Sequence, residues 1–158
     1  MIGAWYTEER SKSFIYSDPI YPNQMVFYQS VNAKINFNSY EDLAAQNIVV
    51  GSVRGYAHVK GLDDSGVEIR YVNNDIQNFK LLERGRIDLL AVDKDYAKHV
   101  LSTPDLEYMA DKVEVINKIL DVRQQHVIIS KKATEAQTKV ALFNQGLKQL
   151  EDNNLKAQ

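Results

Sequence analysis

The stretch Ile-Val-Val-Gly-Ser-Val at residues 48–53 decides the fold class of this chain. A nearly continuous run of β-branched residues is typical of a strand that is buried on both faces of a parallel sheet. A second strand is predicted over Val67–Val72, and the apolar run Ile87–Val92 predicts another. Asn73-Asn74-Asp75 can cap a helix between these two strands, and Gly85 stands where that helix would end. Strands that alternate with helices in this way predict an α/β fold.

The flanking segments predict the remaining elements. His126–Ile129 has the composition of a strand, and Thr134 with Gln137 forms a capping-box pattern that predicts the start of a C-terminal packing helix. The segment Tyr16–Phe37 differs from the rest because it holds two of the three prolines, several aromatic residues and one short alternating strand at Met25–Gln29. We interpret this segment as a connection between two packed units.

Composition excludes several classes of function. With 158 residues and 44% hydrophobic side chains, the chain is long enough for an ordinary core. Its formal net charge of -2 argues against nucleic acid as a partner. No apolar run approaches the ~20 residues of a membrane-spanning helix, and the first residues lack the basic start and apolar core of a signal peptide. Cysteine is absent and the three histidines lack metal-ligand spacing, so we expect neither a metal nor another cofactor.

Polar residues follow two of the predicted strands, where open parallel sheets bind their ligands. Arg54, Gly55 and Tyr56 come after the first strand, and a turn into a helix there would direct backbone N–H groups and a positive helix dipole at an anion. Asp93 follows a neighbouring strand, and its carboxylate is placed to receive an ammonium group. An anion site beside a cation acceptor suits a zwitterion, but Asp93 serves equally well as the cap of the next helix.

Four motifs occur in a specific order along the chain. The first is Thr7-Glu-Glu-Arg10 with the aromatic segment Phe14–Tyr21 that follows it. The other three are Tyr40–Leu43 with the strand that precedes Gly55, Leu-Glu-Arg-Gly-Arg-Ile-Asp-Leu-Leu-Ala-Val-Asp at residues 82–93, and the segment 129–147. In this order they resemble the motifs of the bacterial extracellular solute-binding proteins of family 3, the receptors of polar amino acid ABC transporters.

The resemblance implies a periplasmic-binding-protein type II-like α/β fold. In such a fold two lobes with mixed, mostly parallel sheets close around a small solute by a hinge motion, without performing chemistry. On this basis residues 28–122 form lobe 2, residues 1–27 form part of lobe 1, and residues 123–158 return to lobe 1 as a strand and a C-terminal helix. The first lobe is expected to be incomplete, because the strand, helix, strand and helix that precede the first motif in the family are absent here.

The resemblance also assigns ligand-binding roles. In the family the arginine of the first motif pairs with the ligand α-carboxylate, which a planar guanidinium can hold by two hydrogen bonds, and this role falls on Arg10. The family's aspartate at the end of the third motif receives the α-ammonium, which corresponds to Asp93. Residues after the lobe 2 glycine, here Gly55, add donors to the carboxylate, which corresponds to Tyr56 and Ala57.

Two departures from the family pattern concern the ligand. A hydroxyl residue usually stands where this chain has Ala57, and small hydroxyl residues often precede the first motif where this chain has Gly3 and Trp5. These departures argue against a standard α-amino acid. Trp5 and Tyr56 can instead stack on an aromatic or cationic ligand, while core packing explains Trp5 equally well.

The expected function is that of the substrate-binding component of an ABC importer, acting in the periplasm on an amino acid or a similar small polar solute. Its expected partners are that solute and the membrane subunits of the transporter. Two alternatives use the same fold: a ligand-sensing domain of a signalling protein, and a dehydratase-like enzyme. In the favoured interpretation the chain is not an enzyme and has no catalytic residue. An incomplete lobe leaves sheet edges uncovered, so we also predict association into a homodimer.

Overall fold

The computed structural model describes residues 1–56, 59 and 61–156. The chain forms two compact units: unit 1 comprises Met1–Asn23 and Arg123–Gln158, and unit 2 comprises Gln24–Val122. Strands β3 (Tyr21–Ser30) and β8 (Asp121–His126) contain the two points at which the chain passes from one unit to the other. No helix in the described ranges is both long and apolar enough to cross a bilayer.

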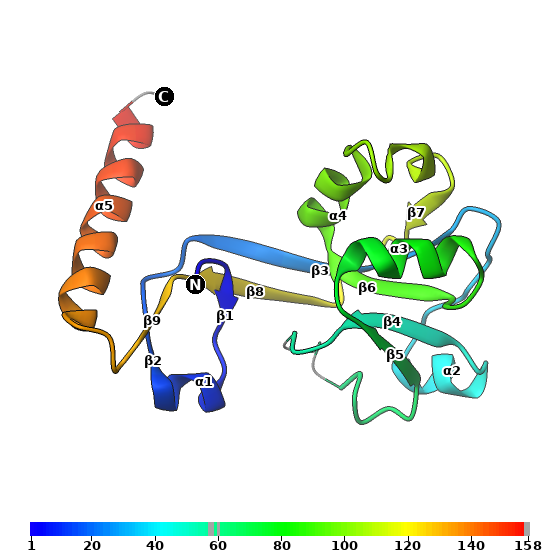
Figure 1. Cartoon of the computed structure of the whole chain (residues 1–158). Helices are drawn as coiled ribbons and strands as arrows, with labels where there is room; N and C mark the ends of the chain where they lie inside the picture. Colours follow the sequence, from blue (N-terminus) through cyan, green and yellow to red (C-terminus); the bar gives the residue numbers. More distant parts are fainter. Residues whose placement is uncertain (57–58, 60, 157–158) are drawn as a thin grey trace. The chain divides into compact units, whose positions relative to one another are not determined.

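A mixed sheet forms the centre of unit 2 (Figure 1). Strand β4 (Val49–Val53) pairs in parallel with β5 (Glu68–Val72) on one side and with β6 (Leu89–Asp93) on the other. Strand β6 also pairs antiparallel with β3, which in turn pairs with β7 (Val113–Val115). The three predicted parallel strands are therefore confirmed, and β4 is almost entirely buried, as its β-branched sequence predicts.

Helix α3 (Asp75–Glu83) connects β5 to β6, as the sequence predicts. Asn74 caps it, because the Asn74 side chain accepts a 2.9 Å hydrogen bond from the backbone N–H of Gln77. Gly85 follows the helix with a φ of +61°, a left-handed conformation that lets the chain leave the helix. Phe79 of α3 is completely buried, so this helix contributes to the core of unit 2.

Two hydrophobic layers cover the faces of this sheet. Phe27 and Tyr28 are neighbours in β3, so their side chains point to opposite faces. Tyr28 packs edge-on against Phe79 of α3. Phe27 packs edge-on against Phe37, which precedes helix α2 (Tyr40–Ala45). Figure 1 shows α3 and α4 (Lys94–Leu101) on one side of the sheet and α2 on the other. The remaining element of unit 2 is the 3-10 helix η1 (Glu107–Met109).

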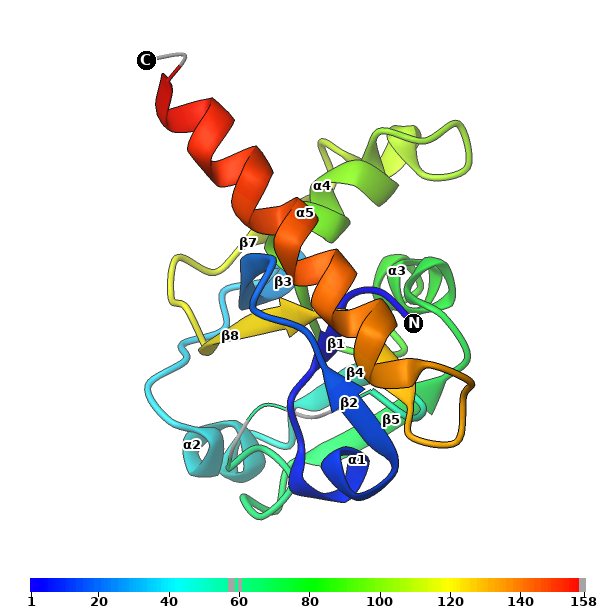
Figure 2. The same ribbon diagram turned by 90° about the vertical axis from the view of Figure 1, so that its left-hand side faces the viewer.

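Unit 1 is built from two strand pairs and two helices. Strand β1 (Ala4–Trp5) pairs antiparallel with β8, and β2 (Phe14–Tyr16) pairs antiparallel with β9 (Ile128–Ser130). Helix α1 (Glu8–Ser13) joins β1 to β2, and α5 (Ala136–Lys156) contacts β2 and β9 (Figure 2).

The predicted strand over His126–Ile129 is present but interrupted at Val127, so that two strands meet there. Strand β8 ends at His126 and β9 begins at Ile128. Ser17 pairs with the residue between them: the Ser17 N–H donates to the Val127 carbonyl at 2.9 Å, and the Val127 N–H donates to the Ser17 hydroxyl oxygen at 2.9 Å. The Val127 N–H is thus paired with a side-chain oxygen, that of Ser17, instead of with the backbone carbonyl of a neighbouring strand.

The C-terminal helix begins later than the capping-box pattern predicts. Glu135 has a φ of +54°, so α5 starts at Ala136 and Thr134 stays outside the helix. On the predicted apolar face Val140 is buried, whereas Leu150 is 63% exposed. Helix α5 therefore packs through its first turns.

The segment 16–37 is more regular than a simple connection. Its predicted strand at Met25–Gln29 is part of β3, which has 10 residues. The chain passes between the two units inside this strand, between Asn23 and Gln24. The segment therefore joins two units, as predicted, but it does so largely as a strand.

Candidate ligand-binding site

Three parallel strands bring their polar ends together in unit 2. Because β4, β5 and β6 run in the same direction, their carboxyl ends lie at one edge of the sheet, where ligands of such sheets bind. Arg54, Gly55 and Tyr56 follow β4, and Asp93 ends β6. Asp75 opens α3 shortly after β5. This edge, which we call the carboxyl edge, therefore gathers the predicted site residues of unit 2 together with a carboxylate that was predicted only as part of a helix cap.

The turn after β4 differs from the prediction. The sequence predicts a helix after Gly55 whose dipole would attract an anion, but the described residues between β4 and β5 form turns and no helix. Gly55 has a φ of +81°, and the backbone N–H of Tyr56 donates to the Val53 carbonyl at 3.2 Å, which closes a tight turn with Arg54 exposed. The predicted helix-dipole anion site is therefore wrong. Ala57, the other predicted donor, lies outside the described residues.

Asp93 uses part of its carboxylate to cap helix α4. Its Oδ1 atom accepts a 2.6 Å hydrogen bond from the backbone N–H of Tyr96. The capping interpretation of Asp93 is thus confirmed. An ionised carboxylate has about four acceptor positions, so a cap and a ligand contact are compatible in one side chain.

Asp75 is the buried carboxylate of the carboxyl edge. It is 1% exposed, whereas Tyr56 beside it is 53% exposed. The Tyr56 hydroxyl donates to Asp75 Oδ2 at 3.4 Å, which is long for a hydrogen bond between oxygens. Burial raises the pKa of Asp75 to about 6; the Tyr56 hydroxyl lowers that pKa, and the negative charge of Asp93 raises it. Burial and the Asp75 carboxylate together raise the pKa of Tyr56 to about 12.

Helix α3 turns two polar side chains toward its packed face. Asp75 and Asn78 are both buried, and among the described residues Asp75 Oδ1 and both polar atoms of the Asn78 amide have no hydrogen-bond partner. The Asn78 amide is close enough to lower the pKa of Asp75, but the two groups form no hydrogen bond of normal geometry. A buried polar group without a partner costs about 1–3 kcal/mol. The fold therefore carries a free-energy cost at this cluster.

The sequence motifs did not identify Asp75 and Asn78 as candidate residues of this site. The pattern Asn73-Asn74-Asp75 already explained the acid as a helix cap. A signal was nevertheless present, because Asp75, Asn78, Phe79 and Leu82 have the i, i+3, i+4, i+7 spacing of one helix face. Two polar residues on an otherwise apolar face indicate a polar site inside the core.

Arg10 belongs to unit 1, where the first motif forms the start of α1. Thr7 Oγ1 accepts a 3.1 Å hydrogen bond from the backbone N–H of Arg10 and thereby caps the helix. The Arg10 guanidinium donates to the Trp5 carbonyl at 3.3 Å, and the Tyr16 hydroxyl donates to the same carbonyl at 3.3 Å. A guanidinium has five N–H donors, so the bond to Trp5 is compatible with further partners.

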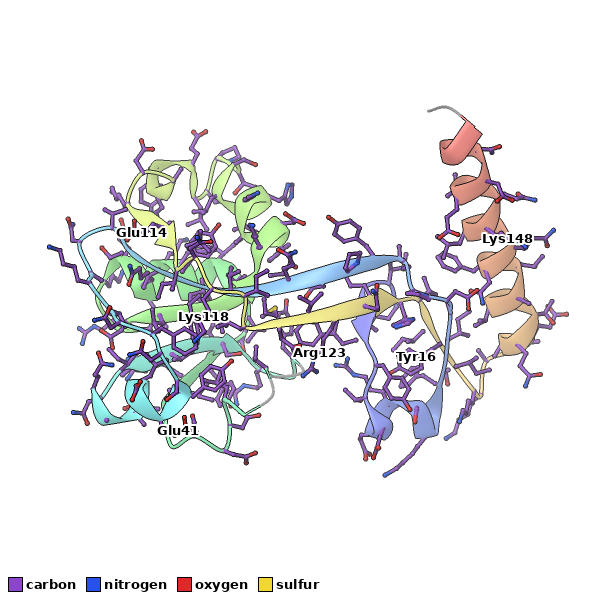
Figure 3. All side chains as sticks on the ribbon, turned by 180° about the vertical axis from the view of Figure 1, so that it is seen from behind. Tyr16, Glu41, Glu114, Lys118, Arg123 and Lys148 are labelled. Atoms are coloured by element: carbon purple, nitrogen blue, oxygen red, sulfur yellow. The ribbon has the colours of Figure 1, made fainter. Side chains whose placement is uncertain are left out.

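The Trp5 side chain is packed within unit 1. It is 9% exposed, and the Arg123 guanidinium lies 4.9 Å from the centroid of a Trp5 ring. Figure 3 labels Arg123 on β8 and Tyr16 on β2. Core packing therefore accounts for Trp5, and its stacking on a ligand stays a prediction.

The part of the chain that the structure describes contains no group of three acidic, histidine or cysteine side chains that could hold a metal ion. His126 Nδ1 lies 2.8 Å from the Ser17 carbonyl, and the His126 ring packs edge-on against Tyr16. His58 lies outside the described residues.

A groove elsewhere in unit 2 is lined by residues 37–41 and 118–120. Lys118 lies over the Phe37 ring, 4.4 Å from its centroid, and donates to the Asn38 carbonyl at 2.6 Å. Figure 3 labels Lys118 and Glu41, which come from the two segments of this lining. None of the predicted ligand-binding residues belongs to this groove.

Solved structures with the same architecture identify the fold. The chain matches a mutant of the arginine-binding protein ArgBP of T. maritima with a TM-score of 0.78 at 21% identity, over 96% of this chain and 62% of that protein. It matches the substrate-binding protein of an amino acid ABC transporter with a TM-score of 0.76 at 22% identity, over 96% of this chain and 64% of the other. The fold is that of a type II periplasmic binding protein. The predicted fold class is therefore confirmed.

A third structure of this fold is an ancestral amino acid-binding protein described as a precursor of cyclohexadienyl dehydratase. It matches with a TM-score of 0.74 at 20% identity, over 96% of this chain and 61% of that protein. This chain thus spans less than two thirds of the length of each of the three proteins. No protein-family model and no curated protein sequence matches the chain.

Proposed function

We propose that this chain belongs to family 3 of the solute-binding proteins and is the substrate-binding component of an amino acid ABC importer. The observation that carries the proposal is the carboxyl edge of unit 2, where Tyr56, Asp75 and Asp93 follow three parallel strands. The fold supports a binding role, because it is shared with an arginine-binding protein and with the substrate-binding protein of an amino acid transporter. The ligand is an amino acid or a similar small polar solute.

Arg10 pairs with the carboxylate of this solute. Its place on α1 is fixed by the Thr7 cap and by the bond from its guanidinium to the Trp5 carbonyl. A planar guanidinium can present two parallel N–H groups to a carboxylate, which an ammonium cannot. Trp5 supports Arg10 through its backbone carbonyl and lines the site beside it.

Asp93 receives the ammonium group of the solute. One carboxylate oxygen is oriented by the helix cap to Tyr96, so the side chain needs little further ordering when it binds a cation. Gly55 provides the left-handed turn that places Tyr56 and Arg54 beyond the end of β4. Tyr56 adds its ring to the site, and Arg54 adds a positive charge near the solute carboxylate.

The protein binds and releases its solute in the periplasm and performs no chemistry on it. The hinge that the family resemblance implies corresponds to strands β3 and β8, in which the chain passes from one unit to the other. Its partners are the membrane subunits of the importer. We also propose a second copy of the chain as a partner, to which Leu142 and Leu150 on α5, 62% and 63% exposed, would contribute apolar surface.

Isothermal titration calorimetry with the twenty standard amino acids tests this function. We expect at least one of them to bind. Arg10→Lys keeps the charge but loses the two-pronged geometry, so it should weaken binding about tenfold or more. Asp93→Asn keeps a good helix cap but removes the negative charge, so it should weaken binding to a similar extent while leaving the fold intact.

Lys12→Ala is the matched control for Arg10, because Lys12 lies on the same helix and its side chain is 72% exposed. This variant should bind like the wild type. Binding that is equally tight in the Arg10 and Asp93 variants would show that these residues do not form the site. Failure of the wild type to bind any amino acid would contradict the proposed function itself.

A further inference from the structure

We propose that Asp75 is a second anionic contact of the binding site and that it receives a positively charged side chain of the solute, an ammonium or a guanidinium, while Asp93 receives the α-ammonium. This inference rests on the proposed function and deepens it, because it defines the solute as a cationic amino acid. It comes from the packing of α3 against the carboxyl edge and not from any family motif.

The first argument is that the described residues provide Asp75 with no ion pair. Asp75 is 1% exposed, and a buried carboxylate normally has a cationic partner or several hydrogen-bond donors. Among the described residues Asp75 makes no ion pair, and the charged group that acts on its carboxylate is another carboxylate, Asp93. Asp75 is thus a buried acid that lies beside a second carboxylate, and such an environment attracts a cation.

The second argument is that Asp75 is not needed as a helix cap. Asn74 already caps α3 by accepting from the backbone N–H of Gln77. Asp75 Oδ1 has no hydrogen-bond partner among the described residues, and the amide of Asn78, one turn further along the same face, has none either. An acid that served as the cap would accept from the N–H groups of the next turn, whereas the backbone group that acts on Asp75 is its own N–H and the residue is 1% exposed.

The third argument is the position of Tyr56 between Asp75 and solvent. Among the described residues the Tyr56 hydroxyl donates to Asp75 Oδ2 at 3.4 Å, and Tyr56 itself is 53% exposed in the turn formed by Gly55. An ammonium or guanidinium donor forms a shorter and stronger bond to a carboxylate than a neutral hydroxyl does. A cationic side chain can therefore displace the hydroxyl from Asp75 and pack against the exposed Tyr56 ring.

The test uses two solutes of nearly equal shape, L-arginine and L-citrulline, which differ in the charge of the side chain. Calorimetric titrations of the 158-residue chain compare the wild type with Asp75→Asn. We expect the wild type to bind arginine at least about tenfold more tightly than citrulline. In Asp75→Asn the affinity for arginine should fall about 10- to 100-fold, whereas the affinity for citrulline should change less than about threefold.

Asp105→Asn is the matched control, because Asp105 is an exposed acid of the same unit and carries the same change of charge. It should preserve the preference for arginine. Circular dichroism of each variant verifies that unit 2 is folded. Tyr56→Phe is a second variant that keeps the ring and removes the hydroxyl, and it should retain or increase the preference for arginine.

The outcomes separate this inference from the proposed function. If Asp75→Asn keeps the full preference for arginine, or if the wild type binds citrulline as tightly as arginine, Asp75 is not a ligand contact. In that case weaker binding in the Arg10 and Asp93 variants still supports the proposed function. If the wild type binds no amino acid, both the function and this inference are wrong.

Discussion

The Tyr56 hydroxyl donates its hydrogen bond to Asp75, a carboxylate that is almost completely buried. The bond joins the turn after β4 to the first residue of α3 and places an acid below an exposed aromatic ring. Because burial raises the pKa of Asp75 to about 6, the ionised side chain destabilises the folded chain at neutral pH. The ionised Asp75 side chain should therefore lower the stability of the folded chain and strengthen the binding of a cationic solute.

Asp75→Asn should increase the free energy of unfolding at pH 8. The pKa of Asp75 in the folded chain, about 6, exceeds the ordinary value of 3.8, so the folded state binds the proton more tightly than the unfolded state. The cost of the carboxylate is fully present above pH 6 and is relieved as the pH falls from 6 toward 4. The variant should be more stable than the wild type by about 1–3 kcal/mol at pH 8, and this difference should shrink toward pH 4.

Urea unfolding of both proteins at pH 8, 6 and 4 measures this difference, and carboxylates common to both proteins cancel in it. Asp105→Asn again serves as the control and should show no comparable gain at pH 8. A variant of Asp75 that is less stable than the wild type at pH 8 would mean that the carboxylate has a stabilising structural role.

Gly51→Ala should destabilise unit 2. A Cβ atom at Gly51 would overlap Ile87 Cδ1 and would lie 2.7 Å from Asn78 Oδ1, and both of these side chains are packed in the core. Overpacking of this kind costs about 1–3 kcal/mol, measurable as a lower urea midpoint. Gly146→Ala in α5 is the control, because a Cβ there meets no atom within 4 Å and alanine favours a helix. It should stabilise the chain by about 0.5–1 kcal/mol, and a loss comparable to that of Gly51→Ala would refute the packing argument.

Asp88→Ala should loosen the start of β4. Asp88 belongs to the third motif, and its Oδ2 atom accepts a 2.9 Å hydrogen bond from the Val49 N–H, while its own N–H donates to the Val49 carbonyl at 2.9 Å. Loss of the side-chain acceptor should cost about 1–2 kcal/mol and speed hydrogen exchange at the Val49 amide. The exposed Asp64→Ala should leave both quantities unchanged. Unaltered exchange at Val49 in the Asp88 variant would show that this bond contributes nothing.

Ser17→Ala should destabilise unit 1. The Ser17 hydroxyl oxygen accepts from the Val127 N–H at 2.9 Å where the chain passes from β8 to β9, and Ser17 is 5% exposed. Without the hydroxyl a buried N–H has no partner, which costs about 1–3 kcal/mol. Ser13→Ala is the control, since Ser13 is exposed and its backbone carbonyl, not its side chain, accepts from Lys131. Equal thermal midpoints for the two variants would contradict the role of Ser17.

Strands β4, β5 and β6 and helix α3 of unit 2 could be predicted because their signals are local. The β-branched run at residues 48–53, the cap at Asn74 and the left-handed Gly85 each depend on neighbours within a few residues. The break at Val127 could not be predicted, because its partner Ser17 is 110 residues away along the chain. The late start of α5 was also missed, since a left-handed Glu135 is rare for a residue with a side chain.

The candidate site was predictable only in part. The positions of the predicted strand ends identified Asp93 and the turn of Arg54, Gly55 and Tyr56 as candidate ligand-binding residues. The structure brings these residues together at the carboxyl edge of unit 2. The helix predicted after Gly55 does not form in the described residues. Local sequence shows that a glycine permits a turn, but it does not show whether a helix follows.

The sequence by itself determined the α/β class and the order of β4, β5, α3 and β6, because hydrophobic periodicity and capping act over a few residues. Only the tertiary structure decided the environment of Asp75. Its burial depends on the sheet below α3, its hydroxyl partner comes from the turn after β4, and its charged neighbour comes from the end of β6. Burial and charge are properties of side chains that meet in space, so an acid that looks like a plain helix cap in the sequence becomes, among the residues that the structure describes, a buried carboxylate without an ion pair.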